Sequence, residues 1–246
     1  MWPAVRLSWP AWIATFEGRC AHPYLDQHKD PKTGRPDPLV TSAIGLLCDP
    51  VSLMLDRPWR ILEGGALVRL ATASEITQGF LAVKSHPELA PLGGGSPRFA
   101  ALTNLRLSEA DIDTLTESAL DEYEREALPY FPEMATRWPC AAQRGIFAML
   151  WALGTRGLVT SFPRFRALAN ALDFAGAAAE SHISNARPAR NAATRALFEE
   201  AAVVVASGLP LDRFIDFPPI PPTSTPPPAP SDPPPDSTPP PPSEAA

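Results

Sequence analysis

A glutamate followed by a glycine, Glu17-Gly18, closes a segment whose apolar residues recur at helical spacing. Ser8 is a good N-cap, so this spacing predicts a helix from Ser8 to Phe16 that stops where Gly18 can adopt the left-handed conformation. The partial negative charge of a helix C-terminus and the nearby aromatic rings both disfavour an ionised Glu17. We therefore expect a raised pKa, as a general acid needs, with a solvated helix-end carboxylate as the structural alternative.

A second carboxylate, Asp26, lies nine residues after Glu17 and follows a short strand-like piece. A second strand-like piece is predicted over Leu39 to Ile44, and it carries the hydroxyl of Thr41. A tight reversal after the first helix would bring Glu17, Asp26 and Thr41 around one groove. Two carboxylates that face each other across a groove are the minimum equipment for hydrolysis of a glycosidic bond.

The order of these residues resembles the phage-type lysozymes, the muramidases that include endolysins and pesticin-like toxins. The family pattern is Glu-Gly, then Tyr-x-Asp, then Thr-x-Gly-x-Gly. The matching segments here are Glu17-Gly18, Tyr24-Leu25-Asp26 and Thr41-Ser42-Ala43-Ile44-Gly45. Further blocks resemble the core helix of the family and the segments after it: Ala141 to Gly154, Phe162 to Phe165 and Arg190 to Phe198. Ala43 departs from the first glycine of the pattern and Leu46 from its His or Asn, and residues 55–135 match nothing in the family.

The resemblance implies a lysozyme-like fold that hydrolyses the β-1,4 bond between N-acetylmuramic acid and N-acetylglucosamine in peptidoglycan glycan strands. It implies that Glu17 protonates the glycosidic oxygen, while Asp26 and Thr41 position a water on the opposite face of the sugar. That arrangement inverts the anomeric carbon. No cofactor is required by this chemistry.

Further residues are expected to contact the substrate. Gly45 belongs to the same motif as Thr41, and Tyr24, together with Trp59, offers an aromatic ring on which a sugar could stack. Arg144 is polar on an otherwise apolar helix, so it either faces the groove or forms a buried ion pair. The histidines stand alone, without the spacing of metal ligands.

The rest of the sequence predicts a mainly helical α+β domain. Helices are expected to open at Ser74-Glu75 and at Ser108, and an apolar central helix is expected over Cys140 to Leu153, ending at Gly154. The remaining expected helices are Phe165 to Ala179 and Ala189 to Ala206, the latter with Pro188 at its first position. Prolines and a glycine between His22 and Asp49 predict a small β-hairpin near the N-terminus, with a long tip from Gln27 to Pro38.

Composition separates this domain from the end of the chain. Of the 32 prolines among 246 residues, fifteen lie between Pro218 and Ala246. We therefore predict one domain over 1–216 and a proline-rich disordered tail over 217–246, which could act as a spacer or as an attachment to a phage or secretion particle.

Without the three acidic residues of the tail, the net charge of the domain is −3, which is a poor match for nucleic acid. No apolar run is long enough to span a membrane, and three cysteines are best read as buried thiols.

Two alternatives to a muramidase stay open. A lytic transglycosylase uses one acidic residue and forms an anhydro-sugar without water, and the presence of Asp26 and Thr41 argues against it. A lysozyme-like fold could also serve as a non-catalytic wall-binding or structural component of a phage or secretion particle. The N-terminal residues show no signal-peptide cleavage site. We therefore expect synthesis in the cytoplasm and release to the cell wall, in the periplasm or outside the cell, by a holin or a secretion apparatus.

Overall fold

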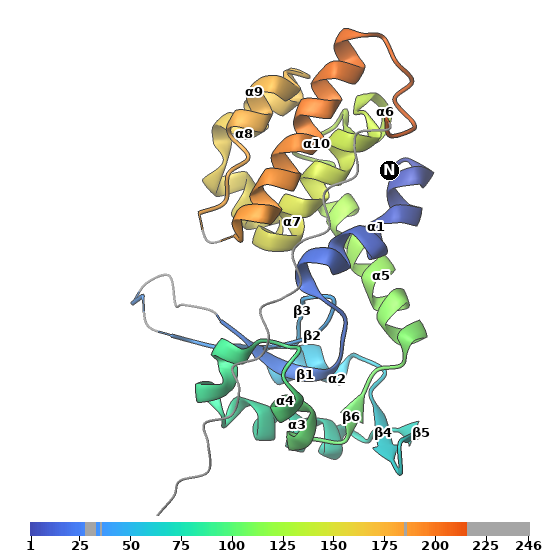
Figure 1. Ribbon diagram of the computed structural model, residues 1–246, viewed down its shortest axis with the longest axis vertical. Helices are drawn as coiled ribbons and strands as arrows, with labels where there is room; N and C mark the ends of the chain where they lie inside the picture. The colour runs from blue at the N-terminus through green and yellow to red at the C-terminus, as the bar shows by residue number, and fades with distance from the viewer. Residues whose placement is uncertain (28–32, 35, 185, 216–246) are drawn as a thin grey trace, which may run out of the picture.

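The computed structural model describes residues 1–27, 33–34, 36–184 and 186–215. Figure 1 shows a helical part at the top and a part with two small sheets at the bottom, with helices running between them. The mainly helical α+β class predicted from the sequence is confirmed. The domain boundary predicted at residue 216, the tail 217–246 and half of the hairpin tip lie outside the described residues.

The first helix, α1 (Pro3–Glu17), begins earlier than predicted. Pro3 stands in its first turn, where the fixed backbone angle of proline suits a helix and its missing N–H costs nothing. Ser8, the predicted N-cap, lies inside the helix, and its hydroxyl donates to a backbone carbonyl one turn earlier. The predicted end is confirmed, because Gly18 has φ 73° and stops the helix. Glu17 therefore lies at the electronegative end of α1.

The central helix, α7 (Cys140–Ser161), is buried on almost all sides in its first half, as predicted. Its predicted end at Gly154 is instead a kink, where Gly154 takes φ 66° and the helix then resumes. The last helix, α10 (Pro188–Ala206), begins at Pro188 as expected and packs along α7. These two helices form the centre of the upper part in Figure 1.

The segment predicted as one helix over Phe165 to Ala179 is two helices, α8 (Pro163–Asn170) and α9 (Phe174–Ala179). Leu172 breaks the run with φ 60°. Asp173 then caps α9, because its Oδ1 accepts the backbone N–H of Gly176 at 2.9 Å. The Asp-x-x-Gly signal therefore outweighs the apolar spacing that favoured a single helix.

Two helices of the middle region begin with a capping box. In α5 (Glu109–Ala127), Ser108 is the N-cap, as predicted. In α3 (Ala73–Lys84), the cap is Thr72 rather than Ser74, since the Thr72 hydroxyl accepts the backbone N–H of Glu75. α5 packs against both α1 and α7 and runs along the right of Figure 1 from the helical part toward the sheets.

The predicted N-terminal hairpin is confirmed and extended by a third strand. Strands β1 (Cys20–Asp26), β2 (Leu39–Ala43) and β3 (Leu46–Leu47) form an antiparallel sheet in the order β1-β2-β3. The register pairs Tyr24 with Thr41 and Asp26 with Leu39. Directly paired residues and residues two apart point to the same face of a sheet. Tyr24, Asp26 and Thr41 therefore share one face.

A second antiparallel sheet lies in the unmatched region and was not predicted. Its order is β5-β4-β6, formed by β4 (Arg60–Glu63), β5 (Ala66–Leu70) and β6 (Leu105–Arg106). Gly64 and Gly65 make the turn of the β4–β5 hairpin with φ 57° and 86°. The shorter elements of the chain are α2 (Val51–Leu55), the 3-10 helix η1 (Pro87–Leu92), α4 (Pro97–Leu102) and α6 (Met134–Arg137).

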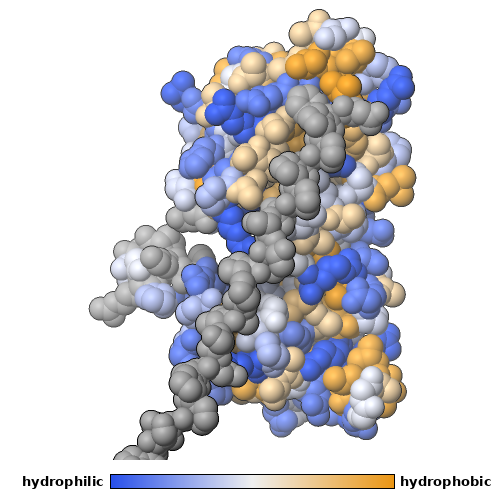
Figure 2. Space-filling view, viewed as in Figure 1, coloured by the Kyte–Doolittle hydropathy of each residue, from blue (hydrophilic) through white to orange (hydrophobic). Residues whose placement is uncertain are grey.

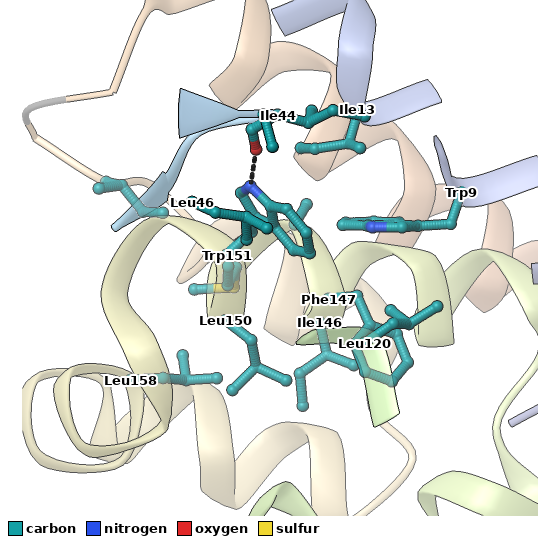
Figure 3. Close-up of a cluster of buried hydrophobic side chains, with 14 of the residues drawn as sticks. Trp9, Ile13, Ile44, Leu46, Leu120, Ile146, Phe147, Leu150, Trp151 and Leu158 are labelled. Carbon is teal, nitrogen blue, oxygen red and sulfur yellow. Dashed lines mark hydrogen bonds between the residues drawn. The ribbon is translucent and has the colours of Figure 1, made fainter. Parts of the chain in front are cut away.

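One continuous apolar core joins the two parts. Figure 3 shows its centre, where side chains from α1, α5 and α7 pack beneath the turn between β2 and β3. The three cysteines, Cys20, Cys48 and Cys140, are free and buried, as the sequence predicted. Among the described helices, none alone combines the length and apolar composition of a membrane span; α7 and α8 meet that test only as a pair bent by 90°.

Candidate active site

Glu17 lies where α1 ends, and the fold surrounds its side chain. The side chain is 23% exposed, and its Oε1 accepts a hydrogen bond from Arg190 Nη1. Burial raises the pKa of Glu17, the Arg190 charge lowers it, and the nearby Asp26 charge raises it again, with a net increase. The direction predicted from the apolar surroundings of the helix end is therefore confirmed.

Arg190 is the partner of Glu17 that the sequence analysis did not single out. It stands in the first turn of α10, only 11% of its side chain is exposed, and its Nη2 donates to the carbonyl of Ala148 at 2.9 Å. A cation in the first turn is opposed by the helix dipole. This unfavourable position is the signal in the sequence that could have indicated a specific partner for Arg190.

Gly45 lies directly against the Glu17 carboxylate, as the shared motif suggested. A Cβ atom at Gly45 would lie 3.1 Å from Glu17 Oε2, and the backbone there has φ 73°. The backbone angle therefore favours glycine, and a larger residue would press on the Glu17 carboxylate. The preceding residue, Ile44, offers its carbonyl to Trp151 Nε1 at 2.9 Å, a bond drawn in Figure 3. This bond fixes the turn that carries Gly45 to the central helix α7.

Asp26 and Thr41 lie on the same face of the first sheet, two residue pairs apart along the β1–β2 ladder. Such diagonal neighbours are within reach of each other's side chains. Asp26 is exposed, and its Oδ1 accepts the backbone N–H of Gln27 at 2.8 Å. Thr41 is buried and its hydroxyl donates to the Leu39 carbonyl at 3.3 Å. The structure thus brings Asp26 within electrostatic range of Glu17.

Tyr24 lies close to both carboxylates but is not an exposed platform. It is only 5% exposed, and its ring packs so tightly on Gly94 that a Cβ there would come within 2.7 Å. Burial raises the pKa of Tyr24, and the charges of Asp26 and Glu17 raise it further. Trp59 is also buried, and its Nε1 donates to a backbone carbonyl. The expectation that either ring stacks on a sugar is therefore wrong, because both rings belong to the core.

Arg144 does not join the other predicted residues. Its guanidinium donates to Ser8 Oγ and lies 3.6 Å from the centroid of the Phe214 ring. Ser8, its partner, lies nine residues before Glu17 on α1. Nine residues span about 13 Å along a helix, which separates Ser8 from Glu17. Burial lowers the pKa of Arg144 to about 10, and the nearby Glu200 charge opposes that change. Arg144 therefore secures the C-terminal segment to α1 and lies away from Glu17.

The other titratable groups among the described residues do not form a metal site. Among the described residues, no group of three or more His, Cys, Asp or Glu side chains is placed to hold a metal ion. Burial lowers the pKa of His22 to about 4. A surface hollow of about 520 Å³ lies between α5 and the kinked end of α7, where Glu126, Tyr130 and Arg156 are among the residues that line it. Glu17 and Asp26 are not among them.

Comparison with known proteins adds no relative. No model of a protein family matches the chain, and no curated protein is significantly similar to it in sequence.

Proposed function

We propose that this protein is a muramidase, a peptidoglycan hydrolase of the phage-type lysozyme family. The observation that carries the proposal is the environment of Glu17, a carboxyl group with a raised pKa at the end of α1. Arg190 holds one of its oxygens, Gly45 lies against the other, and Asp26 is within electrostatic range. Two carboxyl groups with such different surroundings suit an acid and a base.

The contacts distinguish the two oxygens of Glu17. Because Oε1 accepts from Arg190, a proton carried by Glu17 would reside on Oε2, the oxygen beside Gly45. Glycine at that position leaves room for a glycosidic oxygen to approach Oε2. Glu17 would protonate the leaving oxygen there, and the β-1,4 bond between N-acetylmuramic acid and N-acetylglucosamine would break.

Asp26 would act as the base on the opposite face of the sugar. Its side chain is exposed to solvent, unlike that of Glu17. Thr41 lies diagonally behind it, and its hydroxyl could turn from the Leu39 carbonyl to help hold the attacking water. An inverting mechanism needs the two carboxyl groups roughly 6.5–9.5 Å apart, so that a water fits between them and the sugar.

The test is lysis of purified peptidoglycan by the full chain and by three variants. We expect Glu17→Gln and Asp26→Asn each to lower the rate about 100-fold or more, the usual contribution of a general acid or base. Glu117→Gln, a matched change at an exposed carboxylate on α5, should have no effect. Retained activity in Glu17→Gln would refute the proposal.

The products distinguish the competing chemistries. The muramidase proposal predicts new reducing ends whose anomeric configuration is inverted, observed by NMR immediately after cleavage. Anhydro-sugar ends in the mass spectrum would instead identify a lytic transglycosylase. Binding of peptidoglycan without any new ends, unchanged in Glu17→Gln, would identify a non-catalytic wall-binding protein.

A further inference from the structure

A second arginine stands beside the Glu17 site at the beginning of α10. Arg187 is the N-cap of this helix, and Arg190, the partner of Glu17, is its third residue. Side chains at these two positions lie close together, as they do in a capping box. Figure 2 shows hydrophilic residues at mid-height of this face, where Figure 1 places the beginning of α10 above the first sheet. The start of α10 therefore brings two cations to the edge of the site.

Arg187 is exposed, and its side chain forms no ion pair or hydrogen bond with a residue that the structure describes. Its charge nevertheless reaches Glu17: burial raises the pKa of that carboxyl group, and the charge of Arg187 is among those that lower it. The position is unfavourable for a cation, because the helix dipole is positive there and the first turn of α10 has no acidic residue. Arg187 is thus a cation that still lacks a counter-ion.

The charges around Glu17 favour an anionic ligand. Glu17 must carry its proton to act as a general acid, and in that form it leaves Arg190 without a negative partner. The arginines of α10 attract an anionic group, whereas the exposed carboxylate of Asp26 on β1 repels it. Such a group would therefore lie toward α10. A carboxylate matches best, because it can accept two parallel N–H bonds from one guanidinium.

We propose that Arg187 binds a carboxylate carried by the muramic acid residue beside the cleaved bond, and so selects peptidoglycan over neutral glycans. The inference rests on the proposed function. In peptidoglycan the carboxylate belongs to the stem peptide or, where the peptide has been removed, to the lactyl group of the sugar. Pro188 restricts the backbone of Arg187, which has φ −58° and ψ 141°, so the side chain leaves α10 from a fixed point. Arg187 would determine specificity and take no part in proton transfer.

Binding of soluble peptidoglycan fragments by the full chain tests the proposal. The fragments are prepared with stem peptides, without stem peptides, and with all carboxylates converted to neutral amides. Calorimetry in the Glu17→Gln background measures dissociation constants without cleavage, and glutamine mimics the protonated carboxyl group. Adding Arg187→Gln should raise the dissociation constant about tenfold for fragments with free carboxylates, as expected for a hydrogen bond to a charged group. The dissociation constant for amidated fragments should not change. The peptide-bearing and peptide-free fragments together show which carboxylate is bound.

Two further variants separate charge recognition from other effects. Arg156→Gln is the matched control, since Arg156 is also exposed but lies at the hollow between α5 and α7, and it should leave every dissociation constant unchanged. Arg187→Lys keeps the charge and should recover most of the affinity. In the chain with native Glu17, Arg187→Gln should raise KM about tenfold for fragments with free carboxylates and change kcat little, because it removes binding rather than chemistry.

The outcomes distinguish this inference from the proposed function. Affinity that Arg187→Gln does not lower, or lowers equally for amidated fragments, overturns the inference. Absence of any binding to fragments with free carboxylates also overturns it. A chain that binds these fragments through Arg187 but never cleaves them overturns the muramidase proposal and leaves the carboxylate site standing.

Discussion

Replacement of Arg190 by methionine should move the alkaline limb of the pH–activity profile to higher pH. Arg190 holds Oε1 of Glu17 and lowers a pKa that burial raises. Two unit charges about 4 Å apart interact by about 4 kcal/mol at an effective dielectric of 20. Since the Glu17 side chain is 23% exposed, we take about half of that value, about 2 kcal/mol. That energy corresponds to about 1.5 pKa units in the alkaline limb.

The same change should make stability depend on pH. The folded-state pKa of Glu17 lies above the ordinary value of 4.5, and the loss of Arg190 raises it further. A carboxyl group with a raised folded-state pKa contributes stability that is fully present below pH 4.5 and is lost as the pH rises through the folded-state pKa. Arg190→Met should therefore be close to wild type in stability near pH 4 and less stable by about 2 kcal/mol at pH 8.

Two measurements check this reasoning. Lysis rates between pH 4 and pH 9 give the position of the alkaline limb, and thermal unfolding at pH 4 and pH 8 gives the stability difference. Arg195→Met is the matched control, because Arg195 lies on the same helix in an exposed ion pair with Glu199. An alkaline limb that stays in place in Arg190→Met, or that moves equally in Arg195→Met, would show that Arg190 does not set the pKa of Glu17.

Two other regions give predictions of their own. Ala43 is held at φ 54°, so Ala43→Gly should stabilise the protein by about 1 kcal/mol and raise its melting temperature, whereas Ala66→Gly in an exposed strand should give no gain. A destabilised Ala43→Gly would show that the backbone at this position carries no strain. Ending the chain after Phe217 should leave peptidoglycan cleavage unchanged, but ending it after Gly208 removes the Phe214 ring from its guanidinium partner and should lower the melting temperature. Loss of cleavage in the first truncation, or an unchanged melting temperature in the second, would contradict this division of roles.

The features that the sequence predicted correctly depend on neighbours along the chain. Gly18 ends α1 and Ser108 begins α5, because a left-handed glycine and a capping serine act within one turn. The pairing of β1 with β2 also follows from nearby signals, the prolines and the glycine between the two strand-like pieces. Local signals failed where two of them competed, as at Asp173, whose cap divides a predicted helix in two.

The missed features depend on contacts between distant residues. Arg190 meets Glu17 across 173 positions, and nothing local to either residue names the other. Tyr24 was expected to offer its ring to a sugar, but a loop carrying Gly94 covers that ring. Arg144 was expected at the groove because it is polar on an apolar helix, but the C-terminal segment brings Phe214 to it. In each case tertiary packing decides the role of the side chain.

Features that local rules disfavour gather around one carboxyl group. Glu17 occupies the negative end of α1, whose last turn has no basic residue, and Arg190 occupies the positive end of α10. Ala43, two residues before the Gly45 contact, has a backbone angle that suits glycine. Each feature costs stability, and a sequence adjusted for stability alone would avoid all three. Their meeting at Glu17 has a common explanation if the position and pKa of this carboxyl group serve a reaction, because functional sites are where proteins retain such conflicts.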